Sequence, residues 1–136
     1  MNMQTSQQLL IVDGLVYFCD GNPTPLLEGG VTAANITVTH MHWDLGKTIT
    51  EVGRWHKRLS APDSKWRLVK TAGDIERAKQ EGRAGLIMGW QNSLPFDGEV
   101  DRAAAFHALG MRVIQLTYNE ANLAGDGCIE ERNGGL

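Results

Sequence analysis

The densest group of potential ligands in the sequence is His40-Met41-His42-Trp43-Asp44. Imidazole and carboxylate groups are the side chains that most often bind transition-metal ions or transfer protons in catalysis. Two histidines two positions apart on an extended segment point to the same side, so both could reach one metal ion. The alternative is that one histidine faces solvent while the other packs beside Trp43. Because the sequence offers no third ligand here, we assign no residue as a metal ligand.

A second set of polar side chains follows the expected strands. They are Asp13, Gln91, Asn92, Tyr118 and Asn119, with Asn122 on the same rim. Parallel α/β folds place their binding sites at the carboxyl ends of strands. Gln91 can donate and accept hydrogen bonds, but it is a poor metal ligand and no general base. We predict that the first five contact a small substrate, the alternative being ordinary loop residues, and we assign no catalytic residue.

Nucleotide binding is not supported by the glycine pattern. Gly46-Lys47-Thr48 follows a strand and opens a helix, but the phosphate-binding loop needs a glycine five residues earlier, where Met41 stands. No glycine-rich dinucleotide motif follows the first strand either. We therefore expect neither a nucleotide nor a dinucleotide cofactor.

The elements that position these residues alternate between short apolar segments and helix-like segments. This pattern is typical of repeated βα units and a parallel sheet. The expected strands cover residues 9–13, 33–39, 84–90 and 112–118, with a short additional strand at 66–70. The first expected helix is a short stretch that Gly29-Gly30 ends, and the second covers residues 47–59. The third begins at the capping box Thr71-Ala72-Gly73-Asp74 and runs through Gln80. The fourth covers residues 100–109, with Gly110 as its C-cap.

The number of units bounds the fold. The expected class is α/β with one domain over residues 1–136, and the chain contains about four βα units. A closed parallel barrel needs eight units and about 250 residues. We therefore expect either a small open sheet or the first half of a (β/α)8 barrel truncated at its C-terminus. A half barrel leaves strand edges unpaired, which favours a homodimer or aggregation.

Composition excludes several classes of partner. The 136 residues include 13 Lys+Arg and 16 Asp+Glu, a net charge of −3, and no basic block. Nucleic acids and anionic membranes are therefore not expected partners. Cys19 and Cys128 have no metal-type spacing, which favours a reducing compartment. Residues 1–8 lack a basic segment and the apolar run 9–12 is too short for a signal peptide, so we expect a cytoplasmic protein.

Several of these segments together are similar to a known family. They are Ile11-Val12-Asp13-Gly14, the helix 71–82 leading into residues 84–89, Leu109-Gly110-Met111-Arg112-Val113-Ile114-Gln115-Leu116-Thr117-Tyr118-Asn119, and Gly134-Gly135-Leu136. In order and content they resemble the N-terminal half of the membrane (renal) dipeptidase family. The resemblance implies a (β/α)8 barrel, a binuclear zinc site and hydrolysis of dipeptides by a metal-bridging hydroxide.

The chain departs from the family at the positions to which the resemblance assigns function. Leu15 and Tyr17 stand at two metal-ligand positions, Gln91 at the bridging glutamate, and Tyr118 at the substrate-binding histidine. The family's further metal-binding histidines come from later strands, beyond Leu136. Leucine cannot bind zinc and neutral Gln91 cannot bridge two cations, so the usual centre should not assemble. We interpret the chain as a divergent branch with one metal ion or none.

Three functions remain open from the sequence. The first is a dipeptidase-like or amidohydrolase-type metallohydrolase that acts on dipeptides or related small amides. The second is a non-catalytic homologue that binds small molecules on the same scaffold, which the missing ligands favour. The third is a fragment without independent activity. Zinc is implied only by the family resemblance.

Overall fold

The computed structural model of the chain describes residues 9–17 and 20–134. Cys19, Gly135 and Leu136 lie outside these residues, as do residues 1–8. The strands are β1 (Val12–Val16), β2 (Ala33–Thr37), β3 (Trp66–Leu68), β4 (Ala84–Gln91) and β5 (Met111–Gln115). The helices are α2 (Thr24–Glu28), α3 (Leu45–Leu59), α4 (Ala72–Gln80) and α5 (Arg102–Leu109), with a 3-10 turn η1 (Leu94–Phe96). The alternation of strands and helices expected from the sequence is confirmed.

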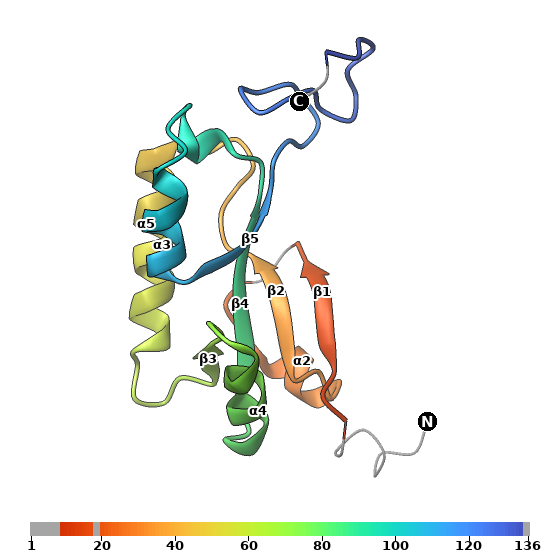
Figure 1. Cartoon of the computed structure of the whole chain (residues 1–136). Helices are drawn as coiled ribbons and strands as arrows, with labels where there is room; N and C mark the ends of the chain where they lie inside the picture. The colour runs from red at the N-terminus through yellow and green to blue at the C-terminus, as the bar shows by residue number, and fades with distance from the viewer. Residues whose placement is uncertain (1–8, 18–19, 135–136) are drawn as a thin grey trace.

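One parallel sheet organises the described chain, and β4 is its central strand (Figure 1). One edge of β4 pairs with β2, from Ala33 opposite Gly85 to Thr37 opposite Gly89. The other edge pairs with β3 along its first half and with β5 along its second half. The short additional strand therefore precedes β5 along the same edge.

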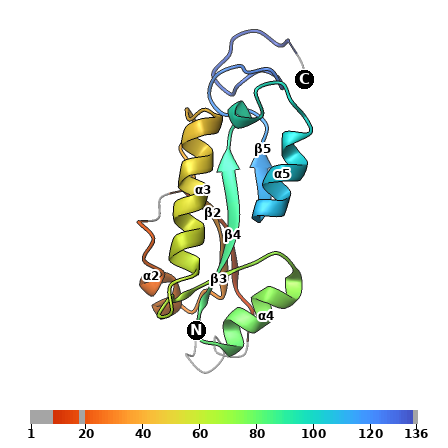
Figure 2. The same cartoon turned by 90° about the vertical axis from the view of Figure 1, so that its left-hand side faces the viewer.

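The core fills one face of the sheet. Successive side chains of a strand point to opposite faces, and Ile36, Leu86, Met88 and Trp90 all point to the face that α3 and α5 cover (Figure 2). On that face Trp90 meets Phe106 of α5 edge-on, with ring centroids 4.5 Å apart. Edge-to-face aromatic pairs add stabilisation beyond the area that they bury.

The opposite face of the sheet is open. A Cβ added at Gly89 would meet Asn35 and Val113, which places these three residues together on that face. Val12, Leu15 and Val113 are 47%, 49% and 41% exposed. Helix α4 lies across the amino-terminal end of the sheet, where Lys79 Nζ donates to the Leu9 carbonyl at 3.1 Å. In a closed barrel this open face would be the interior.

The first and last strands differ most from the sequence prediction, and β2 and β3 also end two residues earlier than expected. The first strand was expected at 9–13 but runs from Val12 to Val16, because a register shift between Asp13 and Val16 carries the ladder past Gly14. The fourth core strand was expected to reach Tyr118 but ends at Gln115. There the Leu116 carbonyl accepts hydrogen bonds from the backbone and side chain of Ser93 instead of continuing a regular ladder.

The predicted start of α4 is confirmed as a capping box. The Asp74 carboxylate accepts from the backbone N–H groups of Lys70 and Thr71 at 3.1 and 2.9 Å. The Arg77 guanidinium, 2.7 Å from Asp74 Oδ1, leads the interactions that hold the pKa of Asp74 well below its ordinary value of 3.8. Gly110, the predicted C-cap of α5, has a φ of 111°. None of the described helices is long and apolar enough to cross a membrane.

Substituting Gly89→Ala should destabilise the protein, because the new Cβ would overlap Asn35 Oδ1 on the open face. We expect the free energy of unfolding, measured by urea denaturation, to fall by about 1–3 kcal/mol. Gly53→Ala in α3 is the matched control, since a Cβ there meets nothing within 4 Å. It should raise stability by about 0.5–1 kcal/mol. An undiminished Gly89→Ala penalty in an Asn35→Ala background would contradict this account.

Substituting Asp74→Ala should cost about 1 kcal/mol of unfolding free energy at neutral pH, through loss of the capping box. The pKa of Asp74 is lowered by folding, so its contribution is complete above 3.8 and is lost as the pH falls toward the lowered value. The stability gap between the wild type and the variant should therefore narrow on acidification, which urea denaturation at several pH values measures. Exposed Glu76→Ala is the control and should change stability by less than about 0.5 kcal/mol.

Candidate functional site

The candidate site begins where β4 ends. Gln91 is the last residue of the strand, and Asn92 and Ser93 follow it directly; all three are buried. Asn92 has a φ of 103°, a left-handed conformation that is uncommon for a residue other than glycine. Such a conformation persists where surrounding interactions hold it, and strained residues of this kind are enriched at functional sites.

Hydrogen bonds from the Asn92 side chain join three loops. Its Nδ2 donates to the Met41 carbonyl at 3.1 Å, in the loop after β2. Its Oδ1 accepts from Asn122 Nδ2 at 2.6 Å and from the Leu94 backbone at 3.3 Å. The strand ends of β2, β4 and β5 are therefore held together through one amide side chain.

Asn122 fixes the loop that follows β5. Its Nδ2 also donates to the Leu116 carbonyl at 2.7 Å, and its Oδ1 accepts from the Ala124 backbone at 2.7 Å. Ser93 Oγ donates to the same Leu116 carbonyl at 2.7 Å. The segment around Ala124 therefore lies against the end of β4. The two segments are far apart in the sequence, since Asn122 follows Ser93 by 29 positions.

Gln91 lies on the open face and has a free acceptor. Its Oε1 is buried and has no hydrogen-bond partner among the described residues. In the register of the sheet it stands opposite Gln115, at the end of β5. A buried acceptor without a partner costs free energy, so a ligand N–H that reached it would be stabilised.

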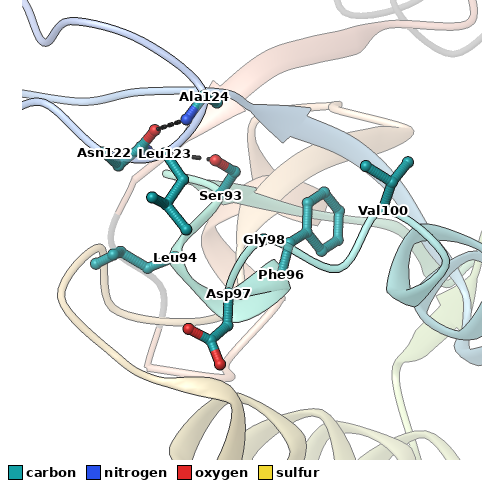
Figure 3. Close-up of a pocket in the computed structure, with 9 residues that line it drawn as sticks. All are labelled: Ser93, Leu94, Phe96, Asp97, Gly98, Val100, Asn122, Leu123 and Ala124. Atoms are coloured by element: carbon teal, nitrogen blue, oxygen red, sulfur yellow. Dashed lines mark hydrogen bonds between the residues drawn. The ribbon is translucent and has the colours of Figure 1, made fainter.

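An apolar cavity of about 220 Å³ adjoins this network (Figure 3). It lies between the loop after β4 and the loop after β5. Its lining consists of Ser93, Leu94, Phe96, Asp97, Gly98, Val100, Asn122, Leu123 and Ala124. Ser93 and Asn122 therefore belong to both the hydrogen-bond network and the cavity wall.

The structure places the predicted site residues in three different settings. Gln91 and Asn92 lie together at the end of β4. Tyr118 and Asn119 lie in the loop after β5, where their carbonyls accept from the backbone of residues 128 and 129 at 2.8 and 3.1 Å. Asp13 does not end its strand as predicted; it is the second residue of β1, and its carboxylate accepts from the Leu15 backbone at 3.0 Å.

The segment around His40 is not extended as the sequence analysis assumed. The Trp43 backbone donates to the His40 carbonyl at 3.0 Å, which closes a turn, and the two imidazole centroids lie 5.3 Å apart. His40 Nδ1 is 3.3 Å from the His42 backbone nitrogen and accepts its hydrogen bond. Asp44 is the N-cap of α3 and accepts from the Lys47 backbone at 2.9 Å. This cluster therefore shapes the start of α3.

The residues present do not fit the binuclear zinc site that the family resemblance implies. Leu15 offers no donor atom, and Gln91 offers a neutral amide where a bridging carboxylate is needed. Residues 9–17 and 20–134 contain no group of three or more His, Cys, Asp or Glu side chains placed to hold a metal ion. Around Asn92 the side-chain donors and acceptors are neutral, namely the amides of Asn92 and Asn122 and the hydroxyl of Ser93.

Sequence reasoning missed Ser93, the Met41 carbonyl and the apolar cavity. The sequence gives only a weak signal for Ser93. It follows two polar residues at a strand end, where polar residues are common in any loop. The left-handed turn at Asn92 is the feature that aims these groups at one another. The only signal of that turn in the sequence is the asparagine itself, because asparagine tolerates left-handed backbone better than most residues other than glycine.

Substituting Asn122→Ala should loosen the loop after β5, because Asn92 Oδ1 and the Leu116 carbonyl each lose a donor and the Ala124 N–H loses its acceptor. We expect faster amide hydrogen exchange at Ser93 and Ala124, equivalent to about 1–3 kcal/mol of lost local stability. Exposed Asn133→Ala is the matched control and should leave both amides unchanged. Equal protection in the two variants would show that the network does not hold the loop.

Comparison with solved structures shows the same fold. An amidohydrolase from Pseudomonas aeruginosa is 30% identical with a TM-score of 0.88, and the match covers 98% of this chain and 41% of that one. The probable dipeptidase PvdM from Pseudomonas aeruginosa is 14% identical with a TM-score of 0.69, covering 90% of this chain and 38% of that one. The expected partial (β/α)8 barrel is confirmed.

A metallo peptidase from Rhodobacter sphaeroides, liganded with a phosphinate mimic of the dipeptide L-Ala-D-Ala, is 13% identical with a TM-score of 0.63. That match covers 83% of this chain and 46% of that one. The chain thus spans less than half the length of each of these proteins. No curated protein matches the sequence.

The family model of membrane dipeptidases (peptidase family M19) matches residues 26–136. The matched range includes β2 to β5 and the loop after β5, and therefore the whole hydrogen-bond network around Asn92 and Asn122. Leu15 and Tyr17, two of the departures from the family pattern, precede it. The extent of this match shows that the chain belongs to the membrane dipeptidase family.

Proposed function

We propose that this chain is the N-terminal part of a hydrolase that cleaves the amide bond of dipeptides or related small amides. The observation that carries the proposal is the family match over residues 26–136, which includes the strand-end site. The relatives with the same fold include a probable dipeptidase and a metallo peptidase that holds a dipeptide mimic. The 30% identical relative is an amidohydrolase, which extends the substrate class to other small amides.

The residues at the end of β4 suit recognition of an amide. Gln91 Oε1 would accept the substrate N–H, and Asn92 holds the surrounding loops in position through its bonds to Met41 and Asn122. Tyr118 and Asn119 would contact the substrate from the loop after β5. Asp13, in the first half of β1, is not part of this contact set. No proton-transfer step is assigned to Gln91, Asn92 or Asn119, because neutral amides cannot act as general bases.

The open face of the sheet supports a proposal about the rest of the protein. The side chains of Val12, Leu15 and Val113 are about half exposed. Further strands that covered them would remove their apolar surface from water, and this burial lowers the free energy of the folded protein. The match covers only 41% of the amidohydrolase chain. We propose that further βα units close the barrel over this face; pairing with a second copy of the chain is the alternative.

A second candidate function is binding without catalysis. The specific observation that favours it is the loss of donor atoms at Leu15 and the neutral amide at Gln91. A binding homologue would retain small amides at the strand ends and would not turn them over. An assay of dipeptide hydrolysis by the full-length protein, in which the released amino acids are measured, separates the two functions. A hydrolase releases amino acids, whereas a binding protein does not.

Substituting Gln91→Ala should lower kcat/KM for dipeptide hydrolysis by at least about tenfold, because the substrate N–H loses a buried acceptor. The measurement is amino-acid release by the full-length protein from a panel of dipeptides. Gln80→Ala, at the exposed end of α4, is the matched control and should leave kcat/KM unchanged. Equal rates for the two variants would exclude Gln91 as a substrate contact.

The purified full-length protein should contain fewer than two zinc ions per chain, because Leu15 and Gln91 cannot complete a binuclear site. Elemental analysis after dialysis, compared with protein concentration, measures the ratio. Hydrolysis measured with a chelator, and again after zinc is added back, tests whether a remaining ion is required. Two tightly held ions per chain would overturn the interpretation that this metal site has diverged.

A further inference from the structure

A shallow hollow lies on the outer surface of α3, at its first turns. It is lined by Trp43, Gly46, Lys47, Thr50 and Arg54, and its volume is about 380 Å³. Gly46 and Thr50 are four positions apart on one face of the helix, and neither has a long side chain. A cavity of about 150 Å³ already holds a molecule the size of benzene. The hollow therefore has room for one apolar side chain of another molecule.

Both cations of the hollow are available to an anionic partner. Lys47 is exposed and forms no ion pair with any residue in the part of the chain that the structure describes. The Arg54 side chain is 64% exposed, and its ion pair is with Glu51 of the same helix, at 2.8 Å. A guanidinium has five N–H donors, so Arg54 retains donors for a second carboxylate. The two cations are two helical turns apart, about 10 Å along the axis of α3.

The segment Glu99-Val100-Asp101 has the complementary pattern. Val100 is 80% exposed and has an acidic residue on each side. Glu99 and Asp101 are exposed, and neither forms an ion pair within residues 9–17 and 20–134. Asp101 precedes α5 as its N-cap residue, but its side chain makes no capping hydrogen bond. An apolar side chain between two carboxylates thus matches an apolar hollow that carries two cations.

Hydrogen bonds and core packing hold this segment in one shape. The Glu99 N–H donates to the Phe96 carbonyl at 2.9 Å, and the Arg102 N–H donates to the Glu99 carbonyl at 3.1 Å. Arg102 Nη1 also donates to the Phe96 carbonyl, at 2.7 Å. The ring of Phe96 packs against Trp90 in the core, with centroids 5.8 Å apart. A segment that is ordered before binding loses little conformational entropy when it binds.

The hollow and the segment lie on the same side of the molecule but do not meet within one copy. Residues 99–101 are not among the residues that line the hollow. Helix α3 contacts η1, which precedes the segment, and α3 and α5 lie side by side in the layer that faces the viewer in Figure 2. This layer covers the side of the sheet opposite the open face. A surface that carries both complementary parts can pair with itself about a two-fold axis, which gives a closed dimer.

We infer that this surface is an interface between two copies of the protein. Val100 of each copy enters the hollow of the other, and Glu99 and Asp101 meet Lys47 and Arg54. The charges orient the two copies, and burial of the valine side chain contributes affinity. This interface does not use the open face of the sheet, and it is independent of the proposed hydrolysis.

Sedimentation velocity of the full-length protein, at a series of protein concentrations, tests for the dimer. Its dissociation constant should rise by about tenfold when the ionic strength is raised from about 0.1 M to about 1 M, because salt screens the charge pairs. A monomer at every concentration would overturn the inference. A dimer whose dissociation constant does not respond to salt would also overturn it, since charge complementarity is its basis.

Charge reversal on each part locates the interface. The double variants Lys47→Glu with Arg54→Glu, and Glu99→Lys with Asp101→Lys, should each raise the dissociation constant by about a hundredfold or more, because like charges then face one another. Mixed in equal amounts, the two variants should associate with each other. In the mixed dimer one contact is native and the other has its charges exchanged. Failure of the mixture to associate would overturn the inference.

An apolar variant and a matched control complete the test. Val100→Ser, at a position that is 80% exposed, should raise the dissociation constant by about tenfold, because the buried valine is lost. Glu76→Lys, at an exposed position of α4, makes the same change of charge elsewhere and should leave association unchanged. A dimer that persists unchanged in Val100→Ser and in both charge variants would show that the copies meet on another surface, and would overturn the inference.

Discussion

The pairing of β4 along both of its edges holds the sheet together. The eight residues of this strand pair with β2 on one edge and with both β3 and β5 on the other. Its even-numbered side chains, among them Leu86 and Trp90, belong to the hydrophobic core on the face that α3 and α5 cover. Its glycines let Asn35 and Val69 approach on the opposite face. Because every other strand takes its register directly or through β2 from β4, the position of Gln91 is set by the whole sheet.

The end of β4 is followed by a residue with left-handed backbone, Asn92. The left-handed turn at Asn92 directs its amide toward Met41 in one loop and Asn122 in another. The cost of that conformation is offset by hydrogen bonds in a buried setting, where each is stronger than in water. The same bonds hold the loop after β5 against the cavity. The left-handed residue Asn92, the hydrogen bonds of its side chain and the cavity therefore adjoin one another at the strand ends.

The side chains that meet at the end of β4 carry no charge. A binuclear zinc centre depends on anionic ligands that neutralise and bridge the ions, whereas the side chains that meet around Asn92 are amides and a hydroxyl. Neutral amides recognise other amides through paired donors and acceptors. The fold alone does not decide between hydrolysis and binding, because one barrel scaffold serves many reactions.

The sequence predicted the α/β class, the order of the strands and helices, the capping box at Thr71 and the glycine cap at Gly110, because these depend on local periodicity and backbone preference. It did not predict that β1 continues past Gly14, that β5 stops at Gln115, or that His40 and His42 lie in a turn. Pairing with a neighbouring strand sets those boundaries, and that partner is distant in sequence. The meeting of Asn92 with Asn122, and the cavity between their loops, likewise depend on contacts that no local pattern encodes.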